Sequence, residues 1–235
     1  MDLGPHPVRN IAIFFIGVIV SAIGVTIAVK SILGVSPSSS IPTVVSTAEI
    51  IRMGVAMTLL QMFFFVCGFL VMGRKNYRPI FLLAIPVLIL YSVTCGLVSD
   101  VTAPYITPDT YLDEWIVVTV GTLLNAVGIS LQLASNLSMV PLDMFANLMS
   151  VRFRMDYSTF KISIDVLLVI IASLLSFILL GSLVGVREGT VFAALFTGAF
   201  TRYITKFMRR KGFYEWAGHR EFSYEIDKKK TSEST

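Results

Sequence analysis

The strongest constraint on this chain is that apolar stretches of about 20 residues recur along it, each long enough to cross a bilayer core of about 30 Å as a helix. Hydrophobic residues make up 55% of the 235 residues and charged residues only 14%, against about 25% in a typical soluble domain. A very apolar soluble helical protein is the alternative, and the low charge disfavours it. The sequence therefore predicts an all-α polytopic membrane protein in contact with the lipid bilayer.

Six transmembrane helices are expected, at residues 11–33, 55–72, 80–98, 115–137, 160–180 and 189–207. They form a single membrane domain over residues 1–208, and a polar tail follows over residues 209–235. The first apolar stretch has no short core with a small-residue cleavage site after it, which predicts a retained first helix rather than a signal peptide.

One segment of the chain occurs twice. Residues 17–46 align without a gap with residues 121–150 at an offset of 104 (121 minus 17), and seven of these thirty positions are identical. Matches at Gly, Ser and Pro carry the comparison, because these residues set backbone geometry. Both copies contain an apolar helix, a break in small residues, a proline and a short segment too polar for an ordinary span. This pattern indicates an internal duplication.

The distribution of charge predicts the topology. If the two short polar segments do not cross the membrane, three basic clusters fall on the same side as Arg9, and the acidic loop 100–114 falls on the other. The clusters are Arg74, Lys75 and Arg78; Arg152, Arg154 and Lys161; and Arg209, Arg210 and Lys211. The positive-inside rule then makes both termini and the tail cytoplasmic.

Each copy of the duplicated unit contains three spans, an odd number, so the two copies enter the membrane upside down relative to each other. The expected fold is therefore six transmembrane helices as a 3+3 inverted repeat, with repeat one at residues 9–99 and repeat two at residues 115–208. Each repeat also contains one short half-helix or re-entrant segment. Inverted repeats of this kind are typical of many secondary transporters.

The two short segments, residues 34–46 and 138–150, are the first candidate for a ligand site. In each, a proline stands where it can begin a helix, and a helix N-terminus attracts anions and carboxylates. If the segments are re-entrant, their tips meet near the membrane midplane. The candidate ligand-binding residues at the tips are Ser36, Ser38, Ser39, Ser40 and Asp143. Alternatively, the segments are amphipathic helices on the two membrane surfaces, capped by Ser and Asp as other helices are.

Polar residues inside the apolar stretches are the second candidate. Asp165 lies in the expected fifth span, and the position 104 residues earlier is Gln61. A buried acid in a membrane helix costs about 2.5–3.5 kcal/mol, so such a residue normally faces protein or a cavity. Lys161, four residues earlier on the same helix face, could instead hold Asp165 in a structural pair. Asn125 is a further candidate ligand, although interhelical hydrogen bonding is the ordinary role for Asn125 and Gln132.

No catalytic, cofactor or metal motif is present in the sequence. There is no Walker loop, dinucleotide fingerprint or nucleophile elbow. His6 and His219 lie outside the expected spans, and no spacing of Cys, His and carboxylates suggests a metal site. The net charge of +4 comes from basic residues at helix ends and in the tail, which fits membrane topology better than nucleic-acid binding. We therefore expect no enzymatic activity, no cofactor and no nucleic-acid partner.

Three motifs resemble a known family. Gly-Val-Ser-Pro at residues 34–37, the basic turn RKNYRP at residues 74–79 and the stretch VGVREGTVFAALFTGAF at residues 184–200 are similar to the YczE/YyaS/YitT group of bacterial integral membrane proteins. Two details differ from the family pattern: Arg187 and Glu188 precede the later Gly-Thr pair, and residues 138–141 read Ser-Met-Val-Pro. The resemblance implies a location in the bacterial cytoplasmic membrane.

These features favour a small-solute transporter or permeation protein whose site lies between the two inverted repeats. A small polar or anionic solute is the expected ligand class. The alternative is a non-transporting accessory or scaffold protein that binds a partner protein or a lipid. A transporter requires a continuous polar path through the candidate residues, whereas a scaffold can bury them as isolated hydrogen bonds. No feature of the sequence predicts an oligomeric state.

Single-cysteine labelling on a cysteine-free background tests the topology. A cysteine placed in loop 100–114 should react with a membrane-impermeant reagent in intact cells, because that loop is expected outside. In the variant Lys75→Cys, the thiol should react with this reagent only after the membrane is permeabilised, because its basic cluster is expected in the cytoplasm. The reverse pattern would contradict the six-span topology.

Overall fold

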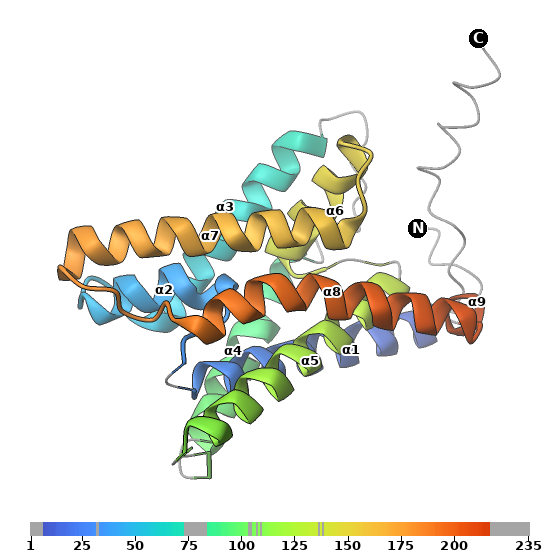
Figure 1. Cartoon of the computed structure of the whole chain (residues 1–235). Coiled ribbons are helices and arrows are strands. Elements are labelled where there is room, and N and C mark those ends of the chain that lie inside the picture. The colour runs from blue at the N-terminus through green and yellow to red at the C-terminus, as the bar shows by residue number, and fades with distance from the viewer. Residues whose placement is uncertain are drawn as a thin grey trace.

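The computed structural model describes residues 7–31, 33–72, 84–102, 105–106, 108, 110–135, 137 and 139–216, and all regular structure in this part of the chain is helical (Figure 1). The helices are α1 (Pro7–Val29), α2 (Pro37–Thr47), α3 (Met53–Met72), α4 (Ala84–Thr102), α5 (Tyr111–Ser135), α6 (Pro141–Arg152), α7 (Tyr157–Leu180), α8 (Glu188–Arg210) and α9 (Phe213–Trp216). The basic turn at residues 74–79 and most of the tail lie outside the described residues.

Within the described residues, four helices are long and apolar enough to cross a membrane: α1, α3, α5 and α7. The apolar part of α4 is shorter and covers Ile85–Val98. In α8, basic residues occupy the last turn. The chain is therefore an all-helical membrane protein, as its apolar stretches predict.

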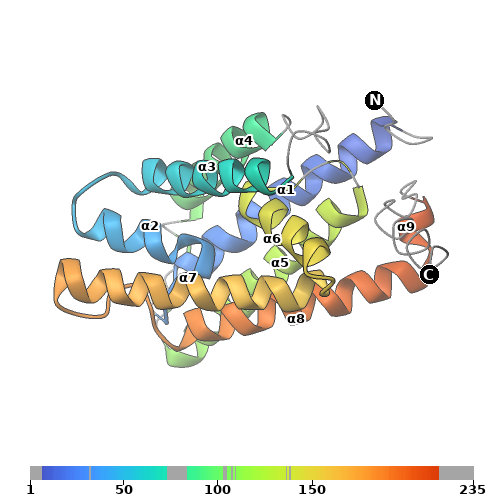
Figure 2. The same ribbon diagram turned by 90° about the horizontal axis from the view of Figure 1, so that it is seen from above.

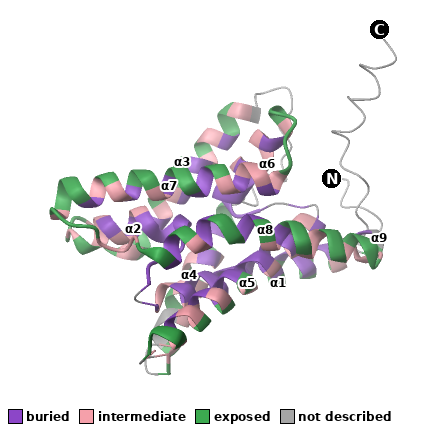
Figure 3. Cartoon of the chain, viewed as in Figure 1, coloured by how far each residue is buried: buried purple, intermediate pink, exposed green. Residues whose placement is uncertain are grey.

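The outward faces of these helices are largely exposed (Figure 3), and many of their exposed residues are large and apolar. Leu70 of α3 is 71% exposed and Ile178 of α7 is 77% exposed. Exposing this apolar surface to water would cost about 25 cal/mol per Å² of free energy. In a bilayer the cost does not arise, because lipid tails are as apolar as leucine. These faces are the surfaces that contact the lipid bilayer.

The helices form two groups of four, and each group takes two helices from each half of the chain. The first group contains α1, α4, α5 and α8, and the second contains α2, α3, α6 and α7 (Figures 1 and 2). Contacts of α3 with α4 and of α7 with α8 join the two groups. The halves are thus intertwined rather than folded as separate bundles.

Contacts between helices occur in pairs that the duplication relates. The offset of 104 residues takes α1, α2, α3 and α4 onto α5, α6, α7 and α8. The helix α1 packs against α4 as α5 packs against α8, and α2 packs against α7 as α6 packs against α3. These contacts of one half therefore have counterparts in which the two halves exchange roles.

The most extensive contact joins α1 and α5, and glycines allow it. A Cβ atom on Gly24 would lie 2.7 Å from the carbonyl oxygen of Gly121, and one on Gly128 would lie 2.6 Å from that of Gly17. Small residues let two helix backbones approach this closely in a membrane. Because Gly17 meets Gly128 while Gly24 meets Gly121, the two helices run antiparallel.

The same contact is reciprocal between the two aligned segments. Gly17 and Gly121 are one position of the duplicated segment, and Gly24 and Gly128 are another, so each glycine contacts the counterpart of the other. This reciprocity is the mark of an isologous interface. Ser21 lies between the two glycines of α1 and donates a hydrogen bond of 2.7 Å to Oδ1 of Asn125, its own counterpart.

The two short segments form α2 and α6, and the start of each is buried. Each begins with a proline, Pro37 or Pro141, whose fixed φ suits the first helical position. Residues 33–40 and 139–144 are all buried. Both helices start three residues later than the segments 34–46 and 138–150, because each helix starts at its proline, and they end one and two residues later.

The beginning of α1 lies beside the end of the described chain. The guanidinium carbon of Arg9 stands 4.5 Å from the ring centre of Trp216 in α9, and that of Arg209 stands 5.1 Å from the ring centre of Tyr214. Arginine over an aromatic face is an attractive contact. The first and last described helices therefore meet at one end of the bundle (Figure 1).

Replacing a crossing glycine tests the backbone contact. We expect Gly24→Ala to lower the thermal unfolding temperature of the purified protein, because overpacking of this kind costs about 1–3 kcal/mol. The matched control is Gly96→Ala in α4, where a Cβ atom meets nothing within 4 Å. The control should stabilise by about 0.5–1 kcal/mol through helix propensity. Equal shifts for the two variants would contradict the close α1–α5 contact.

Candidate functional site

Three buried charged side chains meet where α6 packs against α7. The Nζ atom of Lys161 lies 2.9 Å from Oδ1 of Asp143 and 2.8 Å from Oδ1 of Asp165. The side chains of Lys161, Asp143 and Asp165 are 4%, 9% and 2% exposed. These three residues are called the charged cluster. They place ionic groups inside a helical membrane protein, where such groups are rare.

Local structure explains how the charged cluster assembles. Asp143 lies in the first turn of α6, where the helix dipole favours a carboxylate. Lys161 and Asp165 are four residues apart on α7 and therefore share one face. The packing of α6 against α7 then brings Asp143 to the same ammonium group. Lys161 is consequently shared by an acid on its own helix and an acid on the neighbouring helix.

Two glutamine side chains from other helices cap the start of α6. Oε1 of Gln61 in α3 accepts a 3.0 Å hydrogen bond from the backbone N–H of Leu142, and Oε1 of Gln132 in α5 accepts one of 3.0 Å from Val140. Gln132 also donates to the carbonyl oxygen of Gly17 at 3.4 Å. Leaving buried N–H groups unpaired costs about 1–3 kcal/mol each, so these bonds fix α6 between α3 and α5.

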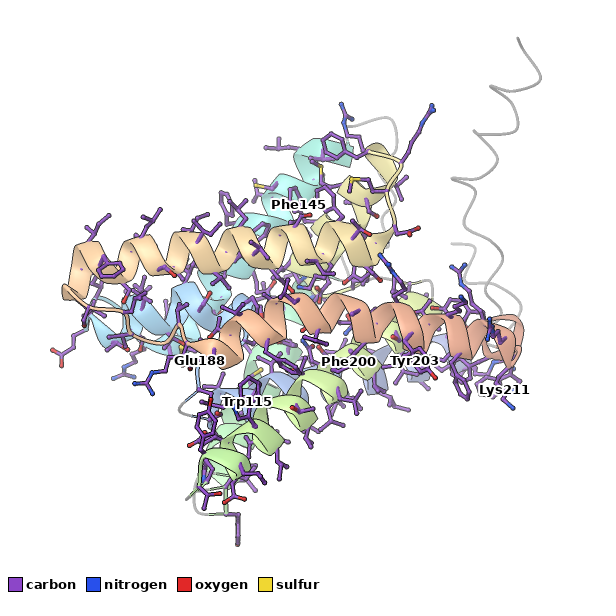
Figure 4. The ribbon with its side chains drawn as sticks, viewed as in Figure 1. Trp115, Phe145, Glu188, Phe200, Tyr203 and Lys211 are labelled. Atoms are coloured by element: carbon purple, nitrogen blue, oxygen red, sulfur yellow. The ribbon has the colours of Figure 1, made fainter. Side chains whose placement is uncertain are left out.

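The surroundings of the charged cluster are mostly apolar. The hydroxyl of Tyr157 donates to Oδ1 of Asp143 at 3.3 Å, and Ile164 belongs to the adjoining apolar core. Figure 4 shows Phe145 on α6 near α3, where its ring centre lies 5.4 Å from that of Phe64. A low local dielectric strengthens the ion pairs and makes any unpaired charge costly.

The charged cluster can offer carboxylate oxygens to a cation or to the hydrogen-bond donors of a polar solute. Among the described residues, no group of three or more His, Cys, Asp or Glu side chains is placed to hold a metal ion. Binding is a chemistry that these carboxylate oxygens support.

The structure brings three of the eight candidate ligand residues together. Asp143 and Asp165 share Lys161, and Gln61 bonds to the helix turn that carries Asp143. Asn125 lies instead in the α1–α5 contact, bonded to Ser21. Interhelical hydrogen bonding is the ordinary role that the sequence predicts for Asn125, and the bond to Ser21 is of this kind.

The four serine candidates bond within the start of α2. The hydroxyls of Ser36 and Ser38 lie 3.1 Å apart, and those of Ser39 and Ser40 donate to the carbonyl oxygens of Ser36 and Pro37. All four side chains are buried. Within the described part of the chain, no hydrogen bond joins them to the charged cluster. A ligand-binding role for these serines stays a prediction.

A separate groove of about 540 Å³ lies where α5 and α8 begin. It is lined by Leu33, Pro108, Thr110, Tyr111, Glu114, Arg187 and Glu188. Trp115 and Glu188, both drawn in Figure 4, mark this end of the molecule. The groove includes neither the charged cluster nor any of the eight candidate residues. Of its two acids, Glu114 is buried and Glu188 is exposed.

Sequence reasoning missed three contacts of these polar residues. The spacing of four residues predicted the Lys161–Asp165 pair but gave no sign of Asp143 or Tyr157, which reach the site through helix packing. The Ser21–Asn125 bond did have a signal in the sequence. These two residues are 104 positions apart, which is the offset between the two aligned segments.

Two of the motifs that carried the family resemblance lie side by side. The backbone N–H of Val35 donates to the carbonyl oxygen of Gly185 at 3.1 Å, and that of Gly189 donates to Leu33 at 2.9 Å. Gly34 has a φ of 122°, a conformation that favours glycine, and a Cβ atom there would collide with the hydroxyl of Thr190. The break after α1 and the start of α8 thus form one junction.

Apolar helices packed around buried polar groups define a polytopic α-helical membrane protein. The chain belongs to a family described as a family of unknown function (DUF6198), whose model matches residues 8–206. No curated protein and no solved structure matches the chain. Similarity to the YczE/YyaS/YitT group stays a prediction from the three motifs.

Removing the shared cation tests the electrostatics of the site. We expect Lys161→Met to destabilise the protein by about 3–5 kcal/mol, because it leaves two buried carboxylates without their ammonium. Thermal unfolding and the monodisperse fraction after detergent extraction measure the effect. The exposed Lys206 supplies the control, since Lys206→Met removes the same charge from the surface of α8. Unchanged stability of Lys161→Met would show that the ion pairs contribute little.

Proposed function

We propose that the protein is a small-solute transporter or permeation protein whose site lies at the charged cluster. The cluster itself is the observation that carries the proposal. Ionisable residues within apolar helices are costly and mark ion or solute pathways in many membrane proteins. Asp165 is only 1% exposed and faces protein rather than lipid, as a pathway residue would.

The proposed architecture is a 3+3 inverted repeat of six spans, in which α4 and α8 are the third spans of the two halves. The antiparallel α1–α5 contact and the paired contacts of the other helices support it. A two-fold axis between antiparallel helices is perpendicular to them, so it lies in the membrane plane if they cross the membrane. Transporters with this symmetry bind substrate at the interface between repeats.

The proposed role of α2 and α6 is that of re-entrant half-helices. Their buried starts and the glutamine caps on α6 support this role, because irregular backbone at membrane depth must be enclosed by protein or line a cavity. Helices lying on the two membrane surfaces would instead keep one side toward the head groups along their whole length. Asp143, Gln61 and the serine candidates would then face a path near the midplane.

We further propose the bacterial cytoplasmic membrane as the location, with both termini in the cytoplasm and no enzymatic activity. The contact of Arg9 with Trp216 supports a common side for the two ends of the bundle. Basic residues Arg209 and Arg210 end α8 at the same side, which the positive-inside rule assigns to the cytoplasm.

An accessory or scaffold protein is the second candidate, and the closure of the site favours it. In this structure Lys161 forms an ion pair with each carboxylate, and the groove at α5 and α8 is separate from them. A protein that only anchors a partner protein or a lipid could bury such a cluster as a structural brace. The two functions differ in whether the cluster affects solute levels.

An untargeted comparison of metabolites tests the proposed function. Cells that lack the gene should differ from wild-type cells in the level of at least one small polar solute, and the wild-type gene should restore it. Asp165→Asn should fail to restore it while remaining folded and at normal abundance, because asparagine keeps the shape of the side chain and removes its charge.

The control for this comparison is Ser163→Ala, which alters an exposed side chain on the same helix. It should restore the solute level fully. Loss of folded protein in Asp165→Asn would favour the structural brace. Unchanged metabolite profiles in all strains would contradict transport and favour the accessory function.

A further inference from the structure

The charged cluster contains more negative than positive charge. Two carboxylates and one ammonium give a net charge of −1 when all three groups are ionised. Lys161 is the one cation within ion-pair distance of either acid in the described part of the chain. An uncompensated charge in a low-dielectric interior carries a large desolvation cost. One further cation would make the cluster neutral.

The other half of the molecule shows that this packing does not require charge. At the offset of 104 residues, the counterparts of Asp143, Lys161 and Asp165 are Ser39, Met57 and Gln61, all uncharged. The helix pair α2 and α3 nevertheless packs as α6 and α7 do. The acids and the lysine of the second half are therefore a feature added to a fold that forms without them.

No second cation from the neighbouring helices faces the charged cluster in the described residues. Residues 37–47 of α2 include no titratable side chain, and the only one in α3 is Cys67. Near Asp143, the other titratable groups are the neutral hydroxyls of Tyr157 and of Tyr91 in α4. On α8, the Arg202 guanidinium bonds to Thr159 on an exposed side of α7.

A proton fits the cluster better than a metal ion does. The ammonium of Lys161 already occupies the space between the two carboxylates, at 2.9 and 2.8 Å. A metal ion that prefers several oxygen ligands would have to displace it. A proton needs no such space, because it binds one lone pair of a carboxylate oxygen.

The two acids differ in how well their ionised forms are stabilised. Asp143 accepts from Tyr157 as well as Lys161 and lies at the N-terminus of α6, where the dipole favours negative charge. Among the described residues, Lys161 is the one ion-pair partner of Asp165, and Oδ1 of Asp165 accepts no hydrogen bond. Asp165 is therefore the better proton acceptor of the pair.

We propose that the charged cluster binds and releases one proton on Asp165, and that this proton is the coupling ion of transport. Hydronium gives its proton to the carboxylate and becomes water, and the cluster changes from a net charge of −1 to zero. Release returns the proton to water. That the proton is the coupling ion rests on the proposed function, whereas proton binding does not depend on it.

Infrared difference spectroscopy of the full-length protein in phosphatidylcholine vesicles tests proton binding directly. Between about pH 5 and about pH 8, a range in which an ordinary aspartate is ionised, the wild type should lose one carboxyl C=O band per protein. Asp165→Gln should lack this band. Asp156→Asn, which removes an exposed acid that precedes α7, should keep it.

The triple variant Asp143→Ser, Lys161→Met, Asp165→Gln places at these three positions the residues found at the corresponding positions of the first half. It should remain folded and show no band. Identical spectra for wild type and Asp165→Gln would overturn proton binding, even if the metabolite comparison supports transport. Loss of the band on adding Na⁺ at constant pH would overturn the choice of a proton. An unfolded triple variant would overturn the comparison between the halves.

Discussion

The structure depends on the approach of α1 and α5 until their backbones touch at four glycines. This contact determines where the site lies, because Gln132 of α5 bonds both to Gly17 in α1 and to the first turn of α6. A side chain at any of these glycines would separate the two helices and move Gln132 away from α6. The geometry of Asp143 is therefore linked to a helix crossing in which Asp143 takes no part.

The two halves share a packing plan but differ in their polar residues. Gln61 of the first half caps α6 through Leu142, whereas its counterpart Asp165 pairs with Lys161. One position of the duplicated unit thus serves as a neutral cap in one copy and as a buried acid in the other. The two halves therefore share these helix contacts, while the three buried charges lie in the second half alone.

Much of the fold followed from the sequence, and the missing parts have a common physical reason. Apolar length and two prolines predicted α2 and α6 and the long helices, and the spacing of four residues predicted the Lys161–Asp165 pair. The contact between Asp143 and Lys161 could not be predicted, because it depends on how α6 lies against α7. The local bonds of the serine candidates also could not be predicted: the hydroxyls of Ser39 and Ser40 donate to nearby carbonyl oxygens, because such an acceptor lies within reach in the first turn of a helix.

The α1–α5 contact joins helices that are far apart along the chain, and this affects how the protein is synthesised. More than one hundred residues separate Gly17 from Gly128, so α1 enters the bilayer well before α5 is synthesised. At about 5–20 residues per second, this interval lasts roughly 5 to 20 s. During that time the glycine and serine face of α1 is without its partner, and an insertase or chaperone that shields small-residue helices would have its main opportunity to act on the nascent chain.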